Sequence, residues 1–297
     1  HKSSHVKPMW DHCEPLARFY NCDGYKPVTA EEVHDMMGVD TYHGGYVDYL
    51  AGHIHPLNLA LGLARAAREL GVQIFEDSRV NDYRTQGEKV RVKTDSGLVE
   101  AKFLVIGCNG YLGRLDKEAE KYQMPINNFL LATEPLGEDR ARHINRDNLA
   151  VVDSRFVVNY WHNSPDHRLI FGGGENYSSR FPRDIKQFVR KYMLEAYPNL
   201  EDAKVEYGWG GTLAITMRRM PHFGRKAHNI YWAQGYSGHG IHMATMGGKM
   251  AADAIMGQAE RFDLFASIKH FPFPGGRWLR WPGLMAGMLY YSMLDHL

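Results

Sequence analysis

The sequence has little cysteine, no long apolar run and almost no net charge. Its three cysteines, Cys13, Cys22 and Cys108, are odd in number and irregular in spacing. They indicate neither a disulfide framework nor a paired-cysteine metal knuckle, and they favour a reducing, cytoplasmic compartment. The formal charge of +1, from 35 basic and 34 acidic residues, gives no field that would attract nucleic acid or an anionic membrane.

No apolar run approaches the roughly 20 residues that cross a bilayer, so no integral membrane segment is predicted. The segment 282–294, preceded by Arg277 and Arg280, comes closest. Its composition favours a tail that docks on its own protein over one that lies on a membrane. The sequence begins abruptly without Met or a signal peptide, which is typical of a piece of something longer.

The chain contains 297 residues, enough for about two domains of roughly 150 residues each. Thr29 followed by Glu32 is a capping-box pattern that predicts a short helix ending at Gly38. Pro56 and the apolar residues after it predict a second helix that ends at Gly71. A third helix is predicted over 183–200, and strands over 46–52, 72–77, 80–86, 89–97, 99–107, 126–135, 155–163, 167–174, 204–215 and 229–234.

This mixture predicts an α+β fold whose domains interleave along the chain. Residues 103–107 are apolar throughout, which predicts a strand buried on both faces. Glycines follow directly, at Gly107, Gly110 and Gly113. A second strand at 229–234 leads into Gly235, Gly238 and Gly240 and then a helix of small residues.

Such a junction lets backbone N–H groups approach a ligand, and the start of the helix favours an anion. Glycine turns also serve plain packing, so this alternative stays open. Neither junction has the GxGxxG pattern with an acidic residue about 20 positions further on that is typical of a dinucleotide site.

Four histidines, in His53-x-His55 and His239-x-x-His242, could in principle supply a metal site. Residues two apart on a strand face the same way, which is compatible with one ion. However, no Asp, Glu or Cys accompanies them at ligand spacing, and no HExxH pattern occurs. No metal is therefore expected, and His55 is interpreted as a polar residue at the start of the helix after Pro56.

A third feature is the group of arginines at Arg218, Arg219 and Arg225 around MPHFG. It is compatible with binding of a carboxylate and equally with a solvated or structural role.

The motifs AGHIHPLNLA, VIGCNGYLG, RLIFGGG, RMPHFGR, NIYWAQGYSGHG, AERFDLFA and FPFPGGR occur in this order. In them the chain resembles the gamma-glutamylputrescine oxidase branch of the FAD-dependent D-amino acid oxidase-like superfamily, from about Tyr25 to the C-terminus. The resemblance implies a two-domain flavoprotein with an α/β FAD-binding part and a substrate domain built on a mixed or antiparallel sheet. It also implies that the strand-GxGxxG-helix portion that normally comes first is missing, so that a partner chain or an N-terminal domain completes the FAD site.

The resemblance further implies which segments of the chain belong to each domain. Residues 1–50 and 114–215 are expected mainly in the substrate domain, 51–113 and 216–270 mainly in the FAD-binding domain, and 271–297 in a C-terminal tail. The residues expected near FAD are Gly107, Asn109, Gly110, Gly235, Gly238, His239 and Gly240.

For the reaction, the resemblance makes His53, His55 and His239 candidate catalytic or orienting groups. Tyr160, Trp161 and Trp209 are candidates for the wall of the substrate pocket, with core packing as an equal alternative because large aromatic residues dominate cores.

Two departures from the family refine the expected chemistry. Leu213 stands where amino-acid-oxidising relatives have an arginine for the substrate carboxylate, which favours a small-molecule amine as substrate. Residues 217–221 contain no cysteine for a flavin thioether, which favours non-covalent FAD. Hydride transfer to flavin with formation of hydrogen peroxide is therefore the leading interpretation. A non-catalytic fragment or subunit of a flavoprotein scaffold is the alternative.

Overall fold

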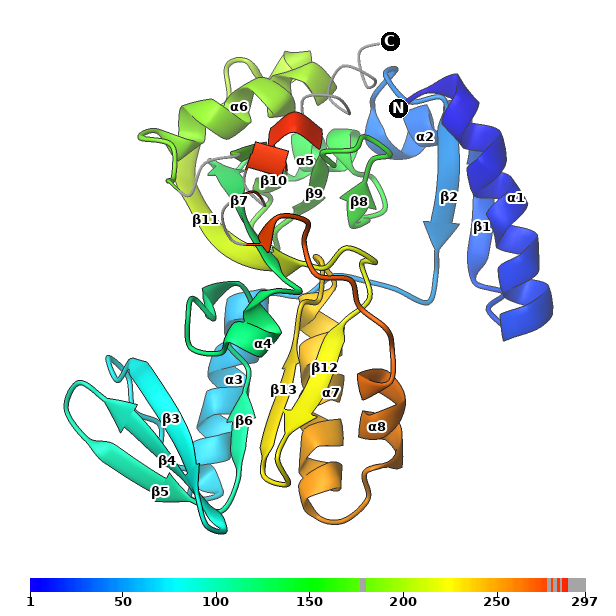
Figure 1. Cartoon of the computed structure of the whole chain (residues 1–297). Helices are drawn as coiled ribbons and strands as arrows, with labels where there is room; N and C mark the ends of the chain where they lie inside the picture. The colour runs from blue at the N-terminus through cyan, green and yellow to red at the C-terminus, as the bar shows by residue number, and fades with distance from the viewer. Residues whose placement is uncertain (177–179, 277–278, 280–281, 284, 288–297) are drawn as a thin grey trace. The chain divides into compact units, whose positions relative to one another are not determined.

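The computed structural model of the chain describes residues 1–176, 180–276, 279, 282–283 and 285–287 (Figure 1). Most of the predicted tail 282–294, with Arg277 and Arg280, lies outside these residues. Helices and sheets are mixed, which confirms the α+β class. Across the described ranges, no helix combines the length and the apolar character that crossing a membrane requires.

The described chain forms two compact units that alternate along the sequence. The first unit contains residues 1–54 and 127–211, and the second contains 55–126 and 212–287. The domain boundaries expected from the sequence fall after residues 50, 113 and 215, whereas the boundaries of the units fall after residues 54, 126 and 211.

The first unit is built on a five-stranded sheet with the order β11-β7-β10-β9-β8 (Figure 1). The strands predicted over 155–163 and 167–174 form an antiparallel hairpin, in which β9 and β10 pair with Leu169 opposite Asn163. Asp184 caps α6 through Oδ1, which accepts a hydrogen bond from the Gln187 amide at 2.9 Å. The bounds are Met124–Thr133 for β7, Val151–Val152 for β8, Tyr160–Asn163 for β9, Leu169–Asn176 for β10, Val205–Ile215 for β11, Glu138–Ile144 for α5, Ile185–Ala196 for α6 and Pro198–Leu200 for the 3₁₀ helix η2.

The N-terminal part of this unit carries a two-stranded sheet, β1 (Tyr25–Thr29) and β2 (Gly44–Asp48), with α2 (Ala30–Met37) between its strands. The predicted capping box of α2 is present, because Thr29 and Glu32 exchange both hydrogen bonds. Helix α1 (Ser3–Tyr20) packs against both strands, although the sequence analysis assigned no element there. Its two internal prolines discourage a helical prediction.

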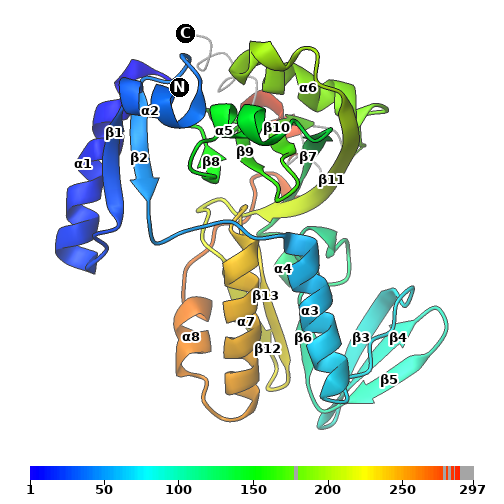
Figure 2. The same cartoon turned by 180° about the vertical axis from the view of Figure 1, so that it is seen from behind.

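The second unit contains a three-stranded sheet with the order β12-β13-β6, in which β13 runs parallel to β6 and antiparallel to β12. Helices α7 and α8 cover one face, with α7 against β13 and α8 against β12 (Figure 2). The opposite face packs on the antiparallel meander β3-β4-β5 and on α4. The bounds are Pro56–Glu69 for α3, Val80–Gln86 for β3, Lys89–Thr94 for β4, Leu98–Ala101 for β5, Leu104–Ile106 for β6, Asn109–Tyr111 for the 3₁₀ helix η1, Lys117–Glu120 for α4, His222–Lys226 for β12, Ile230–Gln234 for β13, Gly240–Ile255 for α7 and Glu260–Ala266 for α8.

Two strand predictions in this unit are wrong. Residues 72–77 form no strand, because α3 runs to Glu69 and the chain then turns through Gly71 at φ +86°. Strand β6 is not buried on both faces, since Val105 is 44% exposed. As the order above places β6 at an edge of its sheet, the described residues provide no strand on its outer side.

Helix α3 begins at Pro56, as predicted. None of its residues is buried, and its leucines Leu57, Leu59, Leu61 and Leu63 are all exposed. Leu57 and Leu61 lie on one side of α3, and Leu59 and Leu63 lie on the opposite side. Exposed apolar residues on both sides are typical of a helix that other polypeptide covers.

Candidate functional site

The two glycine junctions predicted from the sequence lie side by side in the second unit. Strands β6 and β13 pair in parallel with Ile106 opposite Trp232, so Gly107 and Gly235 follow the carboxyl ends of neighbouring strands. The carboxyl ends of parallel strands form the usual ligand-binding edge of an α/β sheet. This edge is the candidate cofactor site.

A hydrogen bond ties the two junctions together. The Gly235 amide donates to Oδ1 of Asn109 at 3.0 Å. Asn109 has a left-handed backbone at φ +45° and Gly235 has φ +70°, so both chains turn sharply at this point. The side-chain oxygen of Asn109 therefore connects the two junctions.

The turn that leads into α7 is fixed from the side of β11. The Ser237 amide donates to the Ala214 carbonyl at 2.9 Å, and the Thr216 amide donates to Oγ of Ser237 at 3.1 Å. Ser237 is buried and has φ +52°. Ser237 and Thr216 were not predicted from the sequence, because hydroxyl residues that support a turn do not recur at a characteristic spacing.

Helix α7 begins at this turn with its first amides uncapped. His239 is the N-cap residue, and its side chain makes no capping hydrogen bond. The 16 residues of α7 sum their peptide dipoles toward this end, which therefore favours negative charge. His239 and Gly238 are both exposed.

The predicted glycines divide into two kinds. A Cβ added at Gly107 or at Gly238 would meet no heavy atom within 4 Å, so open space lies beside both. A Cβ at Gly110 would lie 2.4 Å from the Thr212 carbonyl oxygen, and one at Gly235 would lie 2.8 Å from Cγ2 of Thr216. Gly110 and Gly235 thus permit close packing of the protein, whereas Gly107 and Gly238 border free space. Gly240 has only ordinary contacts with Tyr236.

The two histidines of His53-x-His55 belong to different units. In the first unit, the ring of His53 packs against His162 in a tilted arrangement with centroids 4.5 Å apart, and its Nε2 lies 3.0 Å from the Asn148 carbonyl oxygen. In the second unit, Nδ1 of His55 accepts a hydrogen bond from the Asn58 amide at 3.3 Å and so caps α3. The interpretation of His55 as a polar residue at the helix start is confirmed.

Residues 51–55 form no strand, so the alternation argued for a shared ion does not apply to His53 and His55. Among the described residues, no group of three or more His, Cys, Asp or Glu side chains has a geometry that could hold a metal. His239 and His242 lie close, with ring centroids 6.1 Å apart.

The three aromatic candidates occupy different environments in the first unit. Trp161 is 2% exposed and stacks on Phe171 with centroids 5.5 Å apart, which places it in the core and favours its packing role. Tyr160 is half-buried and its hydroxyl donates to Oδ1 of Asn128. Trp209 is 42% exposed and remains available to line a pocket.

The arginines around MPHFG do not converge. Arg218 donates to the Lys269 carbonyl at 3.2 Å, and Arg225 pairs with Asp263 at 3.2 Å. Arg219 has a left-handed backbone at φ +61°. These contacts support the structural alternative over a shared carboxylate site.

Comparisons with known proteins show the family of the chain. The family model described as "FAD dependent oxidoreductase" (DAO) matches residues 7–254. The chain belongs to this family, whose cofactor is FAD. It is 40% identical over 269 residues to gamma-glutamylputrescine oxidoreductase of Escherichia coli (strain K12), covering 90% of this chain and 63% of that protein. It is 38% identical to the probable oxidoreductase OrdL of Haemophilus influenzae (strain ATCC 51907 / DSM 11121 / KW20 / Rd), covering 87% of this chain and 60% of that one.

The chain therefore spans less than two thirds of the length of these two relatives. Among solved structures, it is similar to glycine oxidase from Geobacillus kaustophilus with a TM-score of 0.77 and 18% identity, covering 91% of this chain and 73% of that one. L-proline dehydrogenase from P. horikoshii gives a TM-score of 0.68 at 21% identity, covering 88% and 71%. At these identities the two structures support the fold.

The residues at this edge fit FAD in two respects. The open space beside Gly107 and Gly238 leaves room for a planar ring or a pyrophosphate at the backbone. The uncapped start of α7 supplies N–H donors and a partial positive charge, which suit the phosphates and the negative charge of a reduced flavin. Both features lie in the second unit.

Proposed function

We propose that the protein is a cytoplasmic amine oxidase that binds FAD non-covalently at the edge formed by β6, β13 and α7. When bound, FAD would supply the hydride acceptor for oxidation of the carbon next to the amine nitrogen, with oxygen as the final electron acceptor and hydrogen peroxide as the product. The single observation that carries this proposal is the hydrogen-bonded pair of glycine junctions next to the uncapped start of α7.

The protein residues contribute binding and electrostatic support. Gly107 and Gly238 admit the cofactor to the backbone, while Asn109, Gly110 and Gly235 hold the two junctions in place. His239 and Gly240 open α7, whose N-terminal amides stabilise negative charge on the reduced cofactor.

On the substrate side, His53, His55 and His239 are the histidines assigned to proton handling or orientation of the amine. His55 has the weakest claim, because its Nδ1 already serves as a helix cap. Trp209 and Tyr160 are proposed as pocket walls, while the burial of Trp161 assigns it to the core. Leu213 offers no charge to a substrate carboxylate, which supports an amine such as a gamma-glutamylated diamine, by analogy with the Escherichia coli relative.

Non-covalent binding is supported by the state of the nearby thiol. Cys108 lies between Gly107 and Asn109, and burial raises the pKa of its thiol. A thiol acts as a nucleophile only as thiolate, so Cys108 is a poor candidate for a covalent bond to flavin at neutral pH.

We further propose that additional polypeptide covers α3 and the outer edge of β6 and completes the FAD site, as a further domain or a partner chain. The exposed leucines of α3 and the 44% exposure of Val105 support this. An edge strand can pair with a further strand, and a helix that is apolar on opposite sides is typical of a helix buried between layers.

The experiment is a visible absorbance spectrum of the purified protein, with identification of the released chromophore by mass, followed by anaerobic addition of amines. Recovery of FAD and its bleaching by a gamma-glutamylated diamine, with no bleaching by the free alpha-amino acids, is the expected result. A protein that stays colourless with added FAD would leave the non-catalytic scaffold as the better description.

A further inference from the structure

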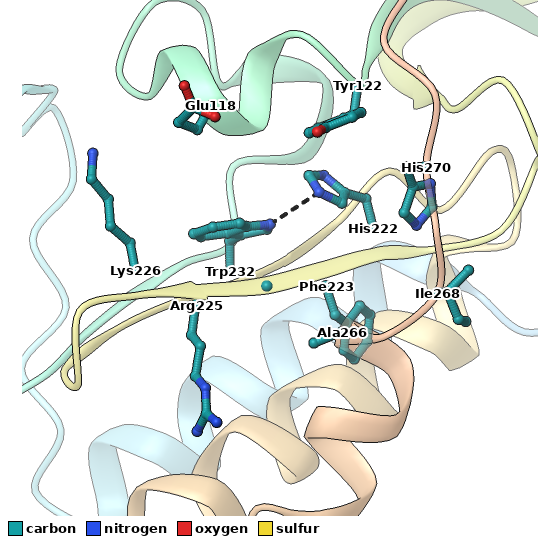
Figure 3. A pocket seen from close by; sticks show the side chains of 11 residues that line it. Glu118, Tyr122, His222, Phe223, Arg225, Lys226, Trp232, Ala266, Ile268 and His270 are labelled. Carbon is teal, nitrogen blue, oxygen red and sulfur yellow. Dashed lines mark hydrogen bonds between the residues drawn. The ribbon is translucent and has the colours of Figure 1, made fainter.

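A cavity in the second unit borders the proposed cofactor edge, since its lining residue His222 pairs with Gln234, the residue before Gly235. It has a volume of about 480 Å³ and lies on the face of the β12-β13 hairpin that packs toward α4. None of the glycines, asparagine or histidines assigned above to FAD or the reaction lines it. In Figure 3 the rings of Tyr122, His222 and His270 gather at one end of the cavity, and Glu118 and Lys226 lie toward the other.

A hydrogen bond from Trp232 fixes the tautomer of His222. The indole Nε1 of Trp232 lies 3.4 Å from Nε2 of His222, and an indole nitrogen can only donate. Nε2 of His222 is therefore the acceptor and carries no proton. Burial, reinforced by the neighbouring His270, lowers the pKa of His222 to about 3, so the ring is neutral near pH 7. Its single proton must then reside on Nδ1.

This Nδ1–H is a buried donor that has no partner among the described residues. His222 as a whole is only 5% exposed. The buried ring nitrogens of His270 make no hydrogen bond of ordinary geometry to the described residues, although the Pro221 backbone lies near enough to raise its pKa. Burial also lowers the pKa of His270, so its ring is neutral and offers one further N–H donor.

The two rings are close enough to serve one ligand group, with centroids 4.9 Å apart. A buried donor without an acceptor costs about 1–3 kcal/mol, so the native protein gains from an occupant that accepts hydrogen bonds. A carboxylate accepts only, and its two oxygens match two converging N–H donors.

The far end of the cavity carries a positive charge. Lys226 lies four residues after His222 on the same strand, and such residues share a face at a separation of roughly 13 Å. Its Nζ is 3.9 Å from Asp116, a long contact that leaves hydrogen-bonding capacity. The carboxylate of Glu118 is offset by Lys121 at 2.6 Å. Between the two ends Trp232 forms a floor, because its indole lies across Gly224 with Cζ2 only 2.2 Å from where a Cβ would stand.

We propose that this cavity binds an elongated small dicarboxylate, with one carboxylate on the ring N–H groups of His222 and His270 and the other on Nζ of Lys226. The body of the ligand lies over Trp232. The site uses none of the residues assigned to FAD, although Cβ of His222 lies only 3.2 Å from where a Cβ would stand at Gly235 of the proposed edge.

The test uses adipate as the probe and the full polypeptide labelled with ¹⁵N at histidine. Ring ¹⁵N shifts report which nitrogen of His222 carries the proton, with His222→Gln used to assign the signals. The expected result is the Nδ1–H tautomer, with saturable shifts of His222 and His270 on addition of adipate. Calorimetry gives the affinity, and adipamide serves as the uncharged ligand control.

Lys226→Met is expected to weaken adipate binding roughly tenfold or more, because a charge-assisted contact is lost. Lys249→Met is the matched control, since Lys249 also pairs with an aspartate but lies on α7 outside the cavity. The proposal is overturned by an Nε2–H tautomer, by equal binding of adipamide, by equal effects of the two lysine variants, or by the absence of any adipate response. The last outcome would mean that the cavity holds only water.

Discussion

The side-chain oxygen of Asn109 accepts a hydrogen bond from the Gly235 amide at 3.0 Å, and this contact joins segments 126 residues apart in the sequence. It links the ends of two parallel strands, each of which continues into a turn next to open space. The arrangement makes Asn109 a positioning residue for the proposed cofactor edge, because its carboxamide oxygen holds the second junction against the first.

Replacing Asn109 by glycine is therefore expected to destabilise the protein by about 1–3 kcal/mol, since the buried Gly235 amide loses its acceptor. Glycine suits the left-handed backbone at this position, so backbone strain does not contribute. Urea unfolding and flavin content are the measurements. Asn109→Asp keeps an acceptor and is the control. Equal stability of the two variants would remove the positioning role.

His55 allows the helix cap to be separated from any part in the reaction. His55→Ala is expected to lower the free energy of unfolding by about 1 kcal/mol, because α3 loses the acceptor for the Asn58 amide. His55→Ser is expected to restore most of this stability, since serine is a good N-cap residue. Thermal unfolding measures the cap. A His55→Ser protein that is stable but has lost amine turnover would assign the imidazole to the reaction.

Much of the fold was predictable because local signals and tertiary structure agree. The capping box at Thr29 and Glu32, the start of α3 at Pro56 and the β9-β10 hairpin all formed where the sequence indicated. The adjacency of the two glycine junctions was not derivable from periodicity, because strand order is set by contacts distant in sequence. The resemblance to a flavoprotein family supplied that link.

The failures have equally specific causes. The segment 72–77 contains Val72, Ile74 and Phe75 and predicts a strand, yet the described chain provides no partner strand for it. The burial of a large aromatic residue cannot be predicted from its type alone. Trp161 lies in the core and Trp209 is 42% exposed, although both are tryptophans on strands. His222 was visible in RMPHFGR, but its orphaned Nδ1 depends on Trp232 across the hairpin.

The lowered pKa of His222 predicts a loss of stability in mild acid. The folded pKa of about 3 lies below the ordinary 6.5, so the unfolded chain binds more protons between these values. The free energy of unfolding therefore keeps its full value above the ordinary pKa of 6.5. As the pH is lowered below that value, it decreases by up to about 1.4 kcal/mol per pH unit. Urea midpoints at several pH values in this window are the measurement.

His222→Gln is expected to flatten this pH dependence, while His228→Gln, which removes an exposed histidine at the turn of the same hairpin, should leave the slope. An unchanged slope in His222→Gln would show that His222 is charged or solvated in the folded protein. Since His270 also has a pKa lowered by burial, part of the slope is expected to remain until both are replaced.

Gly238 provides the sharpest test of the cofactor edge. Gly238→Leu is expected to reduce flavin occupancy at least tenfold, because the side chain would fill the open space beside the start of α7. It also strains the backbone, since φ is +97° at this position. Gly257 is a matched control, because it follows the other end of the same helix with φ +96° and equally open surroundings.

Gly257→Leu therefore carries a similar backbone strain without approaching the proposed site. The ratio of visible flavin absorbance to protein, measured in both variants, separates strain from obstruction of the cofactor. If both variants lose flavin equally, strain in the fold explains the loss. If both keep it, the cofactor does not occupy the space beside Gly238, and the assignment of this turn fails.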